Sequence, residues 1–184
     1  MGIGLRLMMG KNVLNNDRMS QQQAGANYNA FIKTITIIHI ALMAGLAMTT
    51  IIISGIGSEE LGTFSFTQQP KELLIPAGFI AAIILGRFLS KSMLNKLDSK
   101  DTLQKKLGVN QTSHLIKVAP LEAIGFLCVF TYSETNNSFF LAILALVFLL
   151  FISLFPTKGK IENAIPTSTE DQPYLRNPEK PFGS

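Results

Sequence analysis

The sequence is short of cysteine and of charge. Only one of its 184 residues is a cysteine, Cys128, so the chain can form no internal disulfide and has no cysteine-rich metal or haem motif. Charged residues make up 15% of the chain, against about 25% in soluble proteins. Together with a mean hydropathy of +0.32, this scarcity argues against a soluble globular domain, a disordered chain and a disulfide-stabilised scaffold. The composition instead indicates a polytopic membrane protein.

The motifs of soluble enzymes are missing as well. The sequence has no phosphate-binding P-loop, no HExxH zinc motif and no GxSxG nucleophile motif. Gly55 and Gly57 begin like a dinucleotide fingerprint, but Glu60 stands where the third glycine is required. We therefore expect a protein that is not an enzyme and that holds no cofactor or metal.

Four apolar stretches are long enough to cross a membrane. A hydrocarbon core of about 30 Å needs about 17–25 mostly apolar residues in a helix, and residues 31–53, 73–89, 115–132 and 139–155 meet this requirement. The stretches are continuous rather than alternating, which favours helices over the strands of a β-barrel. The predicted fold class is all-α: a polytopic membrane protein with a bundle of four transmembrane helices in a domain covering residues 31–156.

The 16 basic residues predict the orientation of these spans. All of them except Lys71 fall in the N-terminal flank, in the connection between the second and third spans, or in the C-terminal tail. An even number of spans places these three regions on one side, and basic residues accumulate on the cytoplasmic side. Both termini are therefore predicted to be cytoplasmic. Anionic headgroups attract each such residue by about 1 kcal/mol, so the net charge of +4 points to the lipid bilayer as partner and not to nucleic acid.

The two ends of the chain are polar. Residues 1–30 are predicted to form a cytoplasmic segment without a signal peptide, and Met19 is an alternative start of translation. Residues 157–184 contain several prolines among charged residues, which predicts a flexible, extended cytoplasmic tail.

The connection between the second and third spans has helical features. In residues 90–114, leucines recur at near-helical spacing among lysines. We predict a cytoplasmic helical hairpin that extends both spans. Asp98 or Ser99 would cap its second helix, and Gly108 would end that helix.

Two ionisable residues, His39 and Glu122, lie well inside the predicted spans, whereas Lys33, Arg87 and Lys117 lie within three residues of a span end. A charged side chain at the centre of a membrane helix costs about 2.5–3.5 kcal/mol on insertion scales. At 1.5 Å per residue, His39 lies about 12 Å from Phe31, and Glu122 lies about 10.5 Å from Leu115. The two side chains would then share one layer and form a pair between the first and third spans. Such a pair either joins two helices, for about 0.6 kcal/mol, or forms a proton- or cation-responsive site.

Small residues predict where the helices approach one another closely. Gly78, Ala82 and Gly86 recur every four residues in the second span, and Ala41 and Gly45 do so in the first. Such stripes allow close contact between helix backbones in membranes. They favour a compact bundle, a homo-oligomer or a larger membrane complex.

The stretch LEAIGF at 121–126, together with PTKGKI at 156–161, resembles an uncharacterised family of small four-span bacterial membrane proteins. The resemblance covers residues 31–165. It implies a location in the inner membrane and supplies no activity. We therefore predict a small non-enzymatic structural, assembly or regulatory component of a membrane complex or oligomer. The alternative is a small proton- or cation-coupled transporter that uses Glu122 with His39.

Overall fold

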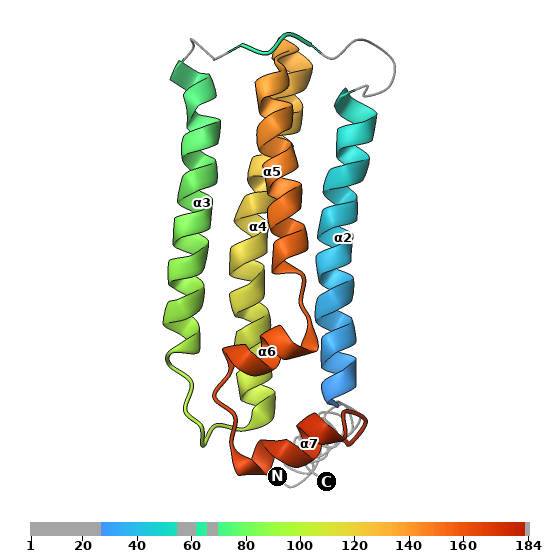
Figure 1. Cartoon of the computed structure of the whole chain (residues 1–184), viewed down its shortest axis with the longest axis vertical. Helices are drawn as coiled ribbons and strands as arrows, with labels where there is room; N and C mark the ends of the chain where they lie inside the picture. The colour runs from blue at the N-terminus through green and yellow to red at the C-terminus, as the bar shows by residue number, and fades with distance from the viewer. Residues whose placement is uncertain (1–26, 55–61, 66–69, 183–184) are drawn as a thin grey trace, which may run out of the picture.

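The computed structural model describes residues 27–54, 62–65 and 70–182, and the regular elements of this part of the chain are all helices. Four long helices run along one axis (Figure 1): α2 (Tyr28–Ser54), α3 (Pro70–Leu94), α4 (Leu103–Thr135) and α5 (Ser138–Leu154). Three short helices lie across one end: α6 (Lys158–Ala164), the 3-10 helix η1 (Thr169–Asp171) and α7 (Gln172–Arg176). The predictions for residues 1–26, including the start at Met19, lie outside the described residues, as do Gly55 and Gly57.

The all-α prediction is confirmed for the described residues. By length and composition, α2, α3 and α4 are each able to cross a membrane. Helix α5 has 17 residues and qualifies only together with α6, from which a bend of 78° separates it. The described part of the chain thus has three to four candidate membrane spans.

Helix α4 is longer than the apolar stretch 115–132 that predicts it. Its 33 residues measure about 50 Å, which exceeds the hydrocarbon core of about 30 Å by roughly four turns of helix. The second arm of the region 90–114 and the third predicted span are therefore a single helix. Its first part projects beyond the apolar zone of the molecule.

The start of α4 differs from the prediction. The residue that caps the helix is Thr102, whose hydroxyl accepts a hydrogen bond from the backbone N–H of Lys105. Asp98 and Ser99 lie in the preceding turn, where the Asp98 carboxylate accepts from the backbone N–H of Lys100. Gly108 does not end the helix but lies within it. A glycine inside a helix costs about 1 kcal/mol relative to alanine, and burial of the surrounding turns outweighs this cost.

A two-residue turn joins α4 to α5. Asn136 adopts the left-handed conformation with φ of 49°, and its N–H donates to the carbonyl of Tyr132 at 2.7 Å. Asn137 caps α5, because its side-chain oxygen accepts from the N–H of Phe139 at 3.1 Å. The same side chain exchanges hydrogen bonds with the backbone of Ser65. These contacts tie the loop before α3 to the start of α5.

Helix α4 is the central helix, since α2, α3 and α5 each make their main contacts with it. The core between the long helices is apolar and includes the following buried side chains: Leu46, Val118, Leu121, Cys128, Val129, Phe140, Val147 and Phe151. Cys128 is fully buried in this core. Its position is that of a small packing residue.

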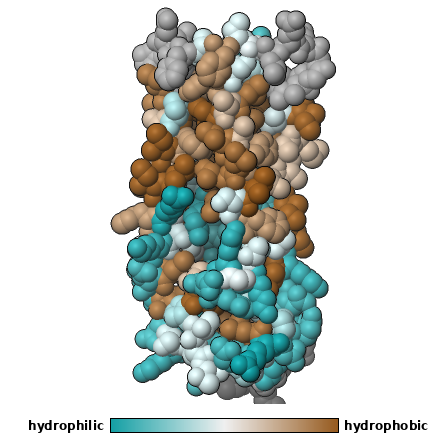
Figure 2. Space-filling model, in the orientation of Figure 1, coloured by the Kyte–Doolittle hydropathy of each residue, from teal (hydrophilic) through white to brown (hydrophobic). Residues whose placement is uncertain are grey.

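The outer surface of the long helices is apolar. Only 22% of the residues in the most apolar window of α2 and of α3 are buried, and 33% in that of α4. Large apolar side chains are exposed on all four helices, among them Ile51, Ile84, Leu127 and Leu149. The face seen in Figure 2 has a broad hydrophobic zone above a hydrophilic end. Several long helices with such an exterior indicate a membrane-embedded protein.

The prediction of a flexible tail is wrong for residues 157–182. This segment folds back onto the hydrophilic end and completes a second core, which consists of Tyr28, Ile35, Leu103, Leu107, Ile161, Ile165 and Leu175. The prolines do not prevent folding because they occupy positions that suit them. Pro156 lies between α5 and α6, and Pro173 lies in the first turn of α7, where no backbone N–H is needed.

A buried ion pair holds this segment to α4. The Lys106 ammonium lies 2.7 Å from the Asp171 carboxylate, and the two side chains are 0% and 5% exposed. Lys106 also donates to the carbonyl of Ser99 at 2.8 Å. Asp171 accepts from the backbone N–H and the hydroxyl of Ser168, at 2.7 and 3.0 Å. Both buried charges therefore have several hydrogen-bond partners, as buried ions require.

Candidate functional site at the end of helix α5

The C-terminal end of α5 is where polar side chains from three other elements meet. The last four carbonyl groups of a helix have no partner within that helix. Lys160 of α6 donates to the carbonyl of Ser153 at 2.7 Å and to that of Phe155 at 3.2 Å. A cation at this end of a helix also interacts favourably with its dipole. The carbonyl groups of Ser153 and Phe155 at the end of α5 therefore have a hydrogen-bond donor from another helix.

His39 of α2 satisfies another carbonyl at this end. Its Nε2 lies 3.1 Å from the carbonyl oxygen of Phe151, and its Nδ1 lies 3.1 Å from Nε2 of His114 on α4. A carbonyl can only accept, so Nε2 of His39 carries the proton that it donates to Phe151. In a neutral His39 the other nitrogen is then an acceptor, and His114 donates to it. The result is a directed chain from α4 through α2 to α5.

The histidine pair is buried. His39 is 0% exposed and His114 is 8% exposed. The rings of Phe151 and Phe155 lie 5.6 and 5.4 Å from that of His39, measured between centroids. The described residues contain no group of three or more His, Cys, Asp or Glu side chains arranged to hold a metal ion. The arrangement joins three helices through polar contacts inside an apolar surrounding.

The structure does not bring His39 and Glu122 together. Both ring nitrogens of His39 are taken by His114 and Phe151. Glu122 lies eight residues beyond His114, about 12 Å further along α4. It is half-buried and forms no hydrogen bond or ion pair within the described part of the chain. The pairing predicted from depth is therefore corrected to His39 with His114.

His39 and Glu122 do not share a layer, because Phe31 and Leu115, from which their depths were counted, lie at different levels along the bundle. Helices α2 and α4 both run upward in Figure 1, and His39 lies beside His114, 75 positions later. By the same offset, Phe31 lies level with about Lys106 and not with Leu115. His114 was missed because it precedes the third apolar stretch. The one sequence signal for it is that the chain has only two histidines.

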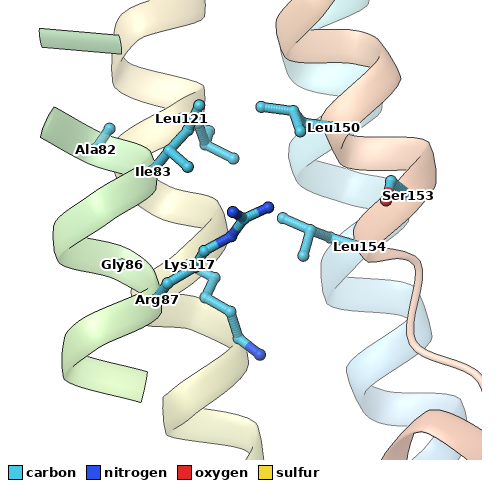
Figure 3. A pocket seen from close by; sticks show the side chains of 9 residues that line it. All are labelled: Ala82, Ile83, Gly86, Arg87, Lys117, Leu121, Leu150, Ser153 and Leu154. Carbon is cyan, nitrogen blue, oxygen red and sulfur yellow. The ribbon is translucent and has the colours of Figure 1, made fainter. Parts of the chain in front are cut away.

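A cleft next to this network contains unpaired cations (Figure 3). It lies between α3 and α5, with α4 behind it, and Arg87 and Lys117 project into it at the level of Ser153 and Leu154. The ion pairs among the described residues involve other lysines: Lys105, Lys106 and Lys158. Neither Arg87 nor Lys117 has a carboxylate partner there.

The two small-residue stripes have different surroundings. A Cβ atom added at Gly86 would lie 3.3 Å from the carbonyl oxygen of Ile116, and one at Gly78 would lie 3.0 Å from the side chain of Ile124. Ala82 between them is 8% exposed. This stripe is therefore used within the chain, for close contact between α3 and α4.

The stripe on α2 faces outward. Ala41 is exposed, and no atom lies within 4 Å of a Cβ added at Gly45. Ala44 beside them is exposed too. These three residues form a shallow notch in the outer face of α2, between the exposed side chains of Ile37 and Met48.

Comparison of the chain with protein-family models, with curated proteins and with solved structures found no match.

Proposed function

We propose that the chain is a four-span protein of the inner membrane, with α2 to α5 as its spans and both termini in the cytoplasm. The charge distribution supports this orientation. Arg87 and Lys91 lie in the last turns of α3, Lys96 lies in the turn that follows, and Lys117 lines the same cleft as Arg87. Helix α3 ends toward the hydrophilic end of the molecule, where the short helices also lie (Figures 1 and 2). Basic residues are retained on the cytoplasmic side during insertion.

Cysteine labelling tests this topology. In a Cys128→Ser background, Ser99→Cys lies in the turn between α3 and α4, and Thr63→Cys lies at the opposite end of the long helices. A membrane-impermeant maleimide applied to intact cells should label Thr63→Cys alone, and cell lysis should expose Ser99→Cys. Labelling of Ser99→Cys in intact cells would contradict the orientation.

We further propose that the protein acts without catalysing a reaction, as a structural, assembly or regulatory component of an oligomer or of a larger membrane complex. The observation that carries this proposal is the notch formed by Ala41, Ala44 and Gly45. Small residues on an outer helix face let a second helix approach to backbone contact, and such contacts drive helix association in lipid. The notch lies on a face of α2 that the described part of the chain leaves uncovered.

Enlarging the notch residues tests the proposal. Gly45→Leu should abolish association in a lipid bilayer, measured as subunit number by single-molecule photobleaching and by mild-detergent pull-down with mass spectrometry. Ala44→Leu should weaken association in the same way, and Ala81→Leu is its matched control, because Ala44 and Ala81 are both exposed alanines but Ala81 lies on α3. If Gly45→Leu and Ala44→Leu both associate as the unmodified chain does, the notch is not an assembly surface.

The alternative is a small proton- or cation-coupled transporter in which Glu122 is the essential acid. The observation in its favour is that this half-buried carboxyl has no polar partner in the described part of the chain, which leaves it free to bind a proton or cation. His39 would not act with it directly. A transporter should lose cation flux in liposomes on Glu122→Gln while remaining folded. An assembly component should keep its oligomeric state after the same change.

A further inference from the structure

The cleft between α3 and α5 is apolar above and cationic below. Its upper walls are formed by Ala82, Ile83, Leu121 and Leu150. Arg87 and Lys117 lie at its lower end, where the guanidinium of Arg87 projects across the opening toward Leu154 (Figure 3). The cleft is open on one side, and its cavity volume is only about 40 Å³. The cleft is therefore a groove along which a chain could lie, and not a chamber.

A larger cavity continues from the cleft around the end of α5. Lys117, Ser153 and Leu154 line both spaces, so the two adjoin. The second cavity measures about 290 Å³ and is also lined by Asn110, His114 and Lys160. This volume is close to the lower limit of about 300 Å³ typical of small-molecule sites. Its donors are arranged around an open space large enough for a polar headgroup.

Three cations border these adjoining spaces, and the described residues that line them include no carboxylate. Arg87, Lys117 and Lys160 have no ion pair within the described residues, and the only polar contacts of the Lys160 ammonium are with backbone carbonyls. Arg87 and Lys160 are exposed and Lys117 is half-buried, so their charges are accessible to an anion at the membrane interface. The charge and shape of the site are thus complementary to an amphipathic anion.

We propose that this groove binds one anionic phospholipid of the cytoplasmic leaflet. Its phosphate lies between Arg87 and Lys117, where a guanidinium can form two parallel hydrogen bonds with phosphate oxygens. The rest of the headgroup extends into the cavity beside Lys160. One acyl chain follows the groove past Ile83 and Leu150. The proposal rests on the orientation proposed above, and the level of the site supports a lipid source, because Arg87 and Lys117 lie below the apolar walls of the cleft, beside the C-terminal end of α5 (Figure 3).

Native mass spectrometry of the purified full chain in detergent tests the proposal. The protein is titrated with phosphatidylglycerol and, separately, with phosphatidylcholine of the same acyl chains. We expect one phosphatidylglycerol to bind in preference to phosphatidylcholine. The double variant Arg87→Gln/Lys117→Gln should weaken phosphatidylglycerol binding by on the order of tenfold, since each interfacial cation contributes to headgroup attraction.

A control with the same loss of charge separates this site from general attraction to the membrane surface. Lys91 and Lys96 are exposed at the same end of the molecule but do not line the groove. Lys91→Gln/Lys96→Gln should leave binding within about twofold of the unmodified chain. Equal loss of binding in the two double variants would overturn the proposal. So would equal binding of the two lipids. Thermal unfolding in detergent without added lipid confirms that both variants remain folded.

A last comparison distinguishes a lipid from a soluble phosphorylated compound. Ile83→Trp should obstruct the apolar part of the groove and lower phosphatidylglycerol binding, whereas Ile84→Trp alters an exposed neighbour outside it and should not. Glycerol 3-phosphate should fail to displace the lipid at millimolar concentration. If glycerol phosphate displaces the lipid and Ile83→Trp has no effect, the ligand is a soluble anion and the lipid assignment is wrong.

Discussion

Replacing Asp171 with asparagine is expected to release the C-terminal segment from α4. The substitution keeps the size of the side chain but removes the charge that neutralises Lys106. The ammonium is 0% exposed, and the carbonyl of Ser99 would remain as its hydrogen-bond partner from outside the pair. Removing one partner of a buried ion pair typically costs about 3–5 kcal/mol, because the other charge stays buried without compensation. Asp171 also accepts two hydrogen bonds from Ser168, which asparagine can replace only in part.

A cost of this size is comparable to the net stabilisation that the segment gains from the second core. The segment 157–182 contributes three buried apolar side chains to that core: Ile161, Ile165 and Leu175. Each stabilises the folded state by about 1.5–3 kcal/mol, part of which is offset by the entropy of ordering the segment. We therefore expect local detachment of α6 and α7, with the long helices retained.

Hydrogen exchange in detergent measures this detachment. In Asp171→Asn, amides of α6 and α7 should exchange at least about a hundredfold faster, as a loss of about 3 kcal/mol requires, while amides in the middle of α4 keep their protection. Asp101→Asn is the control. It breaks the exposed pair between Asp101 and Lys105, in which the hydrogen bond from Lys105 holds the pKa of Asp101 below its ordinary value. That variant should leave exchange in the segment unchanged.

A double replacement refines the result. Lys106→Met/Asp171→Leu removes both charges and fills the space with apolar atoms, which is often neutral or stabilising for a buried pair. The double variant should recover most of the protection that Asp171→Asn loses. If Asp171→Asn exchanges as slowly as the unmodified chain, or if the double variant is worse than either single one, the ion pair does not hold the segment.

Three further substitutions test the packing of the long helices. In a thermal unfolding assay in detergent, His114→Ala should lower stability by about 1–3 kcal/mol, because Nδ1 of the buried His39 loses its partner. His114→Gln retains a hydrogen-bond donor and should lower stability less in the same assay. The hydroxyls of Ser90 on α3 and Ser113 on α4 are 2.5 Å apart, so a Ser90→Cys/Ser113→Cys pair should cross-link the two helices. Gly86→Leu should separate α3 from α4 and abolish this cross-link. An intact cross-link would show that the close contact at Gly86 is dispensable. Asn137→Ala should destabilise the start of α5 by about 1 kcal/mol through loss of its cap, and a midpoint of thermal unfolding equal to that of the unmodified chain would refute this.

The sequence located the long helices well and their partners poorly. The stretches 31–53 and 73–89 lie within α2 and α3, since continuous apolar runs identify membrane helices without reference to the rest of the chain. Helix α4 begins twelve residues before the stretch that predicts it. Its first turns are polar on one side, and they are helical because Leu103 and Leu107 pack against residues far along the chain. No property of residues 103–114 alone reveals that contact.

In the candidate site, too, the sequence identified single residues but not their partners. The sequence identified His39 as a polar residue inside a span. It gave no means of placing His39 beside His114, because that requires the relative level of two helices. The level is fixed by packing along their length, for instance by Leu46 against Gly125.

What the sequence by itself determined is the division of the chain between lipid and water. Hydropathy and charge act on each segment separately, so they specify which stretches are apolar and on which side the basic residues gather. Tertiary structure decided which polar groups meet, because contacts between distant segments depend on helix offset, on close approach at Gly86, and on the folding back of residues 157–182. Those contacts replaced the predicted pair of His39 and Glu122 with two histidines, and they brought Arg87 and Lys117 together in one groove.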